Sequence, residues 1–80
     1  MEKRTGVVGI FISNRKKSAP NVNNILSTYG DLVLGRIGLP FNERANSVIC
    51  LIVEASTDEM GALTGKLGML DGVRVKSFLV

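Results

Sequence analysis

The segment SVICLIVEASTDE, which runs from Ser47 to Glu59, joins the strongest strand signal in the chain to the clearest helix start. Ser47 to Glu54 is apolar at both alternating sets of positions, which is typical of a strand buried on both faces of a sheet. Ser56 and Glu59 have the spacing of a capping box, in which each side chain binds the other residue's free backbone amide. We therefore expect a central strand that leads directly into a helix.

Helical periodicity continues downstream of this capping box and then changes to an alternating pattern. The apolar residues at helical spacing are Met60, Leu63, Leu67 and Leu70. Asp71-Gly72 is a turn signal, and residues 73–78 alternate between apolar and polar side chains, as an edge strand does. A helix followed by a final edge strand is therefore predicted.

Several glycines stand inside this predicted helix, at positions 61, 65 and 68. Each glycine costs a helix about 1 kcal/mol relative to alanine, so their presence needs a structural reason. We interpret Gly61 and Gly65 as positions where the helix lies close to the sheet or to a neighbouring subunit. A flexible or ligand-facing helix is the alternative.

Upstream, Thr5 to Ile12 predicts the other central strand, because this segment is also apolar on both faces. Ser13 to Lys17 is expected to form a basic loop after that strand. A helix is predicted to follow, with its N-cap at Ser18 or Ala19 and with Pro20 in its first turn.

Gly30 is expected to end that helix in the left-handed conformation. Leu32 to Leu39 then predicts an edge strand, because this apolar segment contains two glycines and the charged Arg36. Pro40 to Arg44 has the composition of a turn and joins this strand to the central one.

The predicted element order is strand, helix, strand, strand, helix, strand. With right-handed crossovers, this order gives an α+β ferredoxin-like βαββαβ fold, a four-stranded antiparallel sheet of order 4-1-3-2 with both helices on one face. No linker or repeat divides the chain, so residues 1–80 are expected to form a single domain. The uncovered sheet face would be apolar, which predicts a homo-oligomer, a dimer or tetramer, formed by sheet-to-sheet packing or by edge pairing.

The composition of the 80 residues excludes several kinds of chemistry. There is no histidine and one cysteine, so an imidazole base, a histidine metal site and an internal disulfide are excluded. Cys50 lies in the apolar strand and is interpreted as a small buried hydrophobe of a cytoplasmic protein. Asp58 and Glu59 are explained as charges at a helix start. We therefore expect no catalytic residue, metal ion or cofactor.

Two classes of partner are also disfavoured. No stretch approaches the roughly 18 apolar residues of a membrane span, so no membrane is expected. The net charge of +3 comes from ten basic and seven acidic residues without a dense basic stripe. Phe11 is the only aromatic residue in the two predicted central strands, whereas RNA-binding sheets stack bases on several aromatics. Direct nucleic-acid binding is therefore disfavoured, and weak binding of nucleic acid through the basic residues is the least favoured alternative.

Basic residues gather at one end of the predicted fold, where the loop after the first strand meets the turn between the second and third strands. The first helix directs its N-terminus to this end, which adds to the preference for an anion. The candidate residues for binding a small carboxylate or phosphate compound are Asn14, Arg15, Lys16, Arg36, Glu43 and Arg44. A solvated basic loop is the alternative interpretation.

Three segments together resemble one known family over essentially the whole chain. They are residues 6–10 (GVVGI), residues 35–40 (GRIGLP) with Glu43-Arg44, and residues 57–68 (TDEMGALTGKLG) followed by residues 72–77 (GVRVKS). The sequence resembles the iron-only hydrogenase system regulator family. Its members are small ACT-like proteins, related in fold to the C-terminal domain of the nickel-responsive repressors.

The resemblance implies an ACT-like regulatory module that assembles through its sheets and binds a small effector near the first loop, at a subunit interface. The nickel-responsive repressors bind metal through histidine and cysteine, so no nickel site is inferred for a chain without histidine. Residues 1–4 alone precede the first predicted strand, so a transcriptional role is expected to need a partner protein. The alternative is a protein-interaction module that contacts a regulatory or hydrogenase-maturation protein without a small ligand.

Overall fold

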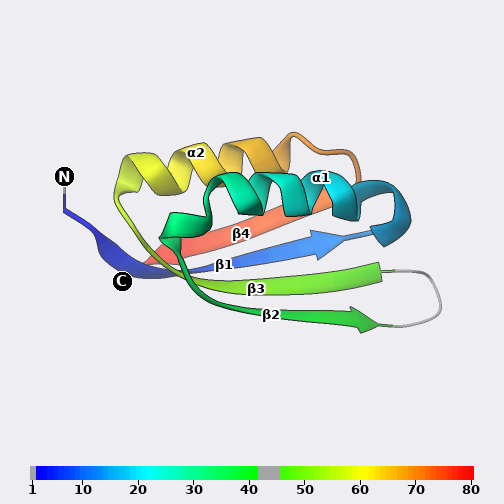
Figure 1. Cartoon of the computed structure of the whole chain (residues 1–80), viewed down its shortest axis with the longest axis horizontal. Coiled ribbons are helices and arrows are strands. Elements are labelled where there is room, and N and C mark those ends of the chain that lie inside the picture. Colours follow the sequence, from blue (N-terminus) through cyan, green and yellow to red (C-terminus); the bar gives the residue numbers. More distant parts are fainter. Residues whose placement is uncertain (1, 42–45) are drawn as a thin grey trace.

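Two helices lie on one face of a four-stranded antiparallel sheet (Figure 1). The computed structural model describes residues 2–41 and 46–80, apart from the side chains of Arg15, Pro40 and Phe41. The elements are β1 (Arg4–Ile12), α1 (Arg15–Thr28), β2 (Val33–Phe41), β3 (Asn46–Ala55), α2 (Thr57–Gly68) and β4 (Val73–Leu79). The strand order β2-β3-β1-β4 is the predicted order, so the ferredoxin-like α+β fold is confirmed.

The hydrophobic core lies between the helices and the two central strands, β1 and β3. Val8 pairs with Leu51 and Ile10 pairs with Ile49, and these residues point toward the helices. The principal buried residues are Val8, Ile10, Ile12, Val22, Leu26, Ile49, Leu51, Val53, Met60, Leu63 and Leu67. Full burial of each large apolar side chain contributes about 1.5–3 kcal/mol, so this layer holds both helices on the sheet.

Gly6 occupies the closest approach between β1 and its surroundings. A Cβ atom at this position would lie 2.5 Å from the carbonyl oxygen of Phe78 and 2.6 Å from Cδ2 of Leu79. The backbone of β4 cannot move away without losing its pairing with β1, so glycine is required here.

The start of α2 is confirmed as predicted. The N–H of Glu59 donates to Oγ of Ser56 at 3.2 Å, and the N–H of Ser56 donates to Oε1 of Glu59 at 2.9 Å. These reciprocal bonds form the predicted capping box. The turn after α2 contains Gly72 with a φ of 72°, a conformation that favours glycine.

α1 begins one turn earlier than predicted. Residues 15–17 are helical, so the prediction of a basic loop from Ser13 to Lys17 is wrong. Asn14 is the N-cap, because its Oδ1 accepts a hydrogen bond from the N–H of Lys17 at 3.3 Å. Ser18 is a buried helical residue whose hydroxyl donates to the carbonyl oxygen of Asp71 at 3.0 Å. Pro20 lies inside the helix and not in its first turn. The contact between Ser18 and the turn after α2 is tertiary, so the local pattern did not reveal it.

The end of α1 also differs from the prediction. Tyr29 is the C-cap, and its N–H donates to the carbonyl oxygen of Ile25 at 3.1 Å. Gly30 is not in the left-handed conformation; it begins a short 3₁₀ turn, Gly30–Leu32, that leads into β2. Leu32 is buried under this turn, so core packing shaped the chain at this point more than the local preference of glycine did.

Cys50 does not belong to the core, contrary to the prediction. Its neighbours Ile49 and Leu51 are buried beneath the helices, whereas Cys50 lies on the opposite face of β3 and is only partly buried. Successive residues of a strand point to opposite faces, and the helices cover one of those faces. The uncovered face therefore carries the cysteine.

Candidate functional site

The sequence-predicted binding residues occupy separate positions in the fold. Asn14, Arg15 and Lys16 lie at the start of α1, where Asn14 is the cap and the Lys16 side chain is exposed. Arg36 lies on the edge strand β2. Glu43 and Arg44 lie outside the described residues. Arg36 contacts α1 through a side-chain hydrogen bond.

Arg36 reaches from β2 to α1 on the helix-covered side of the sheet. Its Nη2 donates a hydrogen bond to Oδ1 of Asn23 at 2.8 Å. Asn23 is neutral, and within residues 2–41 and 46–80 no carboxylate forms an ion pair with Arg36. A guanidinium has five N–H donors in a planar fork, so most of its donors remain for another acceptor. Among the described residues, Arg36 is therefore oriented by a contact that leaves its charge uncompensated.

Arg36 and Asn23 border a groove of about 350 Å³ between α1, β2 and β3. Its lining residues are Ile12, Ala19, Asn23, Arg36, Gly38, Leu39, Ser47 and Ile49. The side chains of Ile12, Ala19 and Ile49 form apolar walls, and the arginine, asparagine and serine supply polar groups. A small ligand site usually combines these two kinds of lining, so the groove suits a compound with an anionic group and an apolar part.

The N-terminal turn of α1 adds positive potential on the same side of the sheet. It carries the basic residues Arg15, Lys16 and Lys17 and has no acidic residue. The helix dipole already places a partial positive charge at this end, so further cations there are unfavourable unless an anion compensates them. The electrostatics of this region therefore favour an anionic ligand.

Sequence reasoning missed four polar or small residues of the groove: Ala19, Asn23, Gly38 and Ser47. Ala19 and Asn23 are four positions apart on one helix, so they share a face. Nothing in the sequence shows that this face meets β2, because Arg36 is 13 positions away from Asn23 and on another element. The isolated charge of Arg36 in an apolar strand was the available signal.

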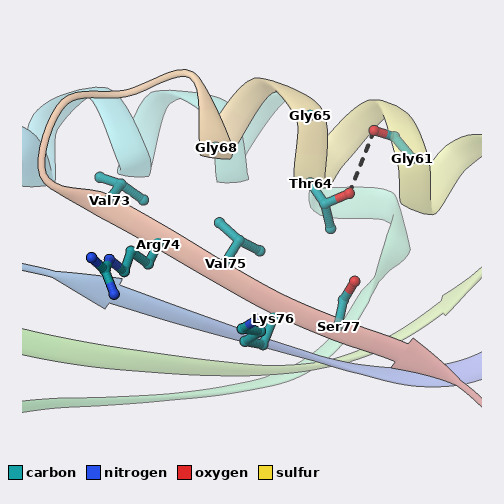
Figure 2. Close-up of a pocket in the computed structure, with 9 residues that line it drawn as sticks. All are labelled: Gly61, Thr64, Gly65, Gly68, Val73, Arg74, Val75, Lys76 and Ser77. Carbon is teal, nitrogen blue, oxygen red and sulfur yellow. Dashed lines mark hydrogen bonds between the residues drawn. The ribbon is translucent and has the colours of Figure 1, made fainter.

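A second groove, of about 530 Å³, lies between α2 and β4 (Figure 2). Gly61, Gly65 and Gly68 line it from the helix, and residues 73–77 line it from the strand. A Cβ atom at any of these glycines would meet no atom within 4 Å. Close packing against the sheet therefore does not explain them, and that part of the interpretation is wrong. A neighbouring subunit, a flexible helix or a ligand remains as the explanation.

In the part of the chain that the structure describes, no group of three or more His, Cys, Asp or Glu residues could hold a metal ion. The hydroxyl of Thr64, in the second groove, is engaged within its own helix, because it donates to the carbonyl oxygen of Met60 at 2.9 Å. No helix among the described residues is long and apolar enough to cross a membrane.

Comparison with known proteins identified a family and a solved relative. The family model of TM1266-like proteins, described provisionally as iron-only hydrogenase system regulators, matches residues 4–77. The solved structure of protein TM1266 from Thermotoga maritima is 37% identical, covers 99% of both chains and has a TM-score of 0.93. No curated protein matched the chain.

Two more distant solved structures share the fold. The ACT domain of GTP pyrophosphokinase from Chlorobium tepidum is 15% identical, with a TM-score of 0.75 over 98% of this chain and 89% of that chain. The regulatory subunit of aspartate kinase from Thermus flavus is also 15% identical, with a TM-score of 0.65 over 95% of this chain and 52% of that chain. These likenesses show the fold alone, and they confirm its ACT-like character.

Proposed function

Because the chain belongs to the TM1266-like family of iron-only hydrogenase system regulators, we propose that it is a homo-oligomeric regulatory domain that senses a small anionic effector. The observation that carries the proposal is the Arg36 guanidinium, held by neutral Asn23 at the border of the groove between α1 and β2. We place this function in the cytoplasm, where the single cysteine persists as a thiol.

The contacts around Arg36 support an anionic ligand over a neutral one. An arginine binds a carboxylate or phosphate through two parallel charge-assisted hydrogen bonds, which are about twice as strong as neutral ones. Asn23 orients the guanidinium without neutralising it, and Ser47 offers a further hydroxyl across the groove. The apolar walls then select the remainder of the compound.

The uncovered apolar face of the sheet favours a second function, a protein-interaction module. In that alternative, the domain contacts a regulatory or hydrogenase-maturation protein and needs no small ligand. The two functions use different surfaces. The sensing function requires the groove of Arg36, whereas the interaction module requires the opposite face of the sheet.

Thermal unfolding in the presence of amino acids, nucleotides and simple organic acids tests the sensing function. A ligand at 100 times its dissociation constant adds about 2.7 kcal/mol to the free energy of unfolding, which a melting experiment detects easily. We expect an anionic compound to raise the melting temperature of the native chain. Arg36→Gln should abolish that rise.

Lys66→Gln is the matched control, because it removes one positive charge from an exposed residue of α2 outside the groove. This control should keep the ligand-induced rise. No stabilising compound in a broad screen, or an equal rise in Arg36→Gln and Lys66→Gln, would contradict the proposed effector site.

A further inference from the structure

The central part of the sheet face opposite the helices consists of three rows of paired residues, which we call the open face. The register places them as Gly35-Ile52-Val7-Phe78, Ile37-Cys50-Gly9-Lys76 and Leu39-Val48-Phe11-Arg74, in the order β2, β3, β1, β4. The two positive charges of these rows therefore lie at one edge, on β4, and the β2 edge carries none.

The apolar side chains of the open face are substantially exposed. Ile37 is 65% exposed, Leu39 is 62% exposed and Phe78 is 58% exposed, although all three are large hydrophobic residues. Four strands of seven to ten residues, at about 4.8 Å between strands and about 3.3 Å per residue, present a sheet face on the order of 500 Å². A contiguous patch of this size on a small domain marks an interaction surface.

We propose that the open faces of two copies of this chain stack on each other, with β4 of each copy over β2 of the other. This inference rests on the homo-oligomeric part of the proposed function and identifies the surface that forms the oligomer. The face is of the same order as the roughly 800 Å² that each partner buries in a standard interface. Two stacked sheets in proteins pack about 10 Å apart with nearly aligned strands.

The positions of Arg74 and Lys76 select the orientation. If β4 lay over β4, the cations of both copies would meet in the interface, and the three rows contain no acidic residue to compensate them. If β4 lies over β2, the aliphatic stems of these side chains cover the opposite β2 edge while their charged groups reach solvent at the rim. A two-fold axis along the strands, between β1 and β3, produces this second arrangement.

The same axis places the large side chain of Phe78 opposite Gly35. The other facing pairs are Cys50 with Gly9, Ile52 with Val7, Val48 with Phe11, Ile37 with Lys76 and Leu39 with Arg74. A Cβ atom at Gly35 would meet no atom within 4 Å, so this position is open to receive Phe78 of the second copy. An isologous interface must be complementary to itself, and this face meets that condition in shape and in charge.

Cys50 reports directly on this interface, because it is the only cysteine in the chain and lies in the middle row of the open face. We expect maleimide labelling of the native chain to slow as the protein concentration rises, in parallel with dimer formation in sedimentation. Pairing through an edge strand would leave Cys50 accessible at every concentration, which distinguishes the two modes of assembly.

Charge substitutions in the open face test both the surface and the orientation. Ile52→Glu should raise the dimer dissociation constant at least about a hundredfold, because it buries a carboxylate opposite Val7. Met69→Glu is the matched control, since Met69 is an exposed hydrophobic residue of the helix layer, and it should leave association unchanged. Circular dichroism verifies that each variant is folded.

A pair of substitutions at Ile37 tests which edges face each other. Ile37→Glu should preserve the dimer, because the new carboxylate faces Lys76 of the second copy, and Ile37→Lys should weaken it. Equal weakening by both variants would overturn the orientation. A monomer at all concentrations would overturn the stacked dimer and leave the open face to a different protein. An oligomer with freely labelled Cys50 would overturn this interface while the homo-oligomer itself would stand.

Discussion

The two helices pack on the same face of the sheet, but their N-terminal ends are built differently. α2 starts with two reciprocal hydrogen bonds between Ser56 and Glu59, has acidic residues in its first turn and ends with Lys66 in its last turn. α1 starts with one cap bond of 3.3 Å from Lys17 to Asn14, and its first turn is basic. The charges of α2 therefore match the helix dipole, whereas those of α1 oppose it.

The N-terminal turn of α1 is therefore locally less stable than that of α2. A sequence that follows the local rules at one helix and breaks them at the next indicates a functional or strained position at the second. The groove bordered by Arg36 and Asn23 lies against α1, so the uncompensated positive charge and the candidate effector site occur on the same helix. α2 follows the local rules of helix stability, and α1 is the element that binds the anion in the proposed function.

Removing the two caps should give the largest difference between the helices. Ser56→Ala is expected to cost about 1–2 kcal/mol, because it breaks a buried capping box, and Asn14→Ala about 0.5 kcal/mol, because its cap bond is exposed and long. Urea unfolding of both variants measures the costs. An equal cost, or a larger one for Asn14→Ala, would show that the two helix starts contribute alike.

Reversing a charge at the start of α1 should have a smaller effect and the opposite sign. Lys16→Glu is expected to stabilise the chain by about 0.3–1 kcal/mol, because a carboxylate is favourable at a helix N-terminus. The same substitution should weaken binding of the anionic effector. Lys66→Glu, which places a carboxylate in the last turn of α2, should destabilise instead. A destabilising Lys16→Glu would break the comparison between the two helices.

The smallest expected effect is a pH dependence at the start of α2. The pKa of the Glu59 carboxyl is lowered from its ordinary value of 4.5, mainly by the backbone N–H of Ser56 and further by the nearby Lys3 ammonium. A lowered pKa in the folded chain means that the stabilisation is present above pH 4.5 and is lost as the pH falls through the folded value. Melting curves from neutral pH to below 4.5 should show a smaller acid-induced loss for Glu59→Gln than for the native chain.

Much of the fold was predictable because its signals are local. The apolar alternation of residues 5–12 and 47–54 identified the two central strands, and the spacing of Ser56 and Glu59 identified the start of α2. The resemblance of three segments to the iron-only hydrogenase system regulator family is likewise confirmed. These features depend on neighbours within one element, which the sequence displays directly.

The errors all concern contacts between elements. α1 starts early where Ser18 binds the carbonyl of Asp71, a residue 53 positions away. Gly30 adopts the 3₁₀ turn in which Leu32 is buried, and not the left-handed conformation that was predicted for it. The predicted basic site was outlined from charge alone, so Arg36 was included, but its partner Asn23 on α1 was missed.

Periodicity, caps and motifs are properties of short segments, so the amino-acid sequence was enough to identify the order of the elements, the two central strands and the family. Tertiary packing settled which side of β3 the helices cover, and with it the exposure of Cys50. It also decided that Arg36 meets Asn23 and that Gly61, Gly65 and Gly68 face an open groove. These outcomes depend on how separate elements pack, and packing is fixed by the burial of the whole apolar surface and not by any one segment.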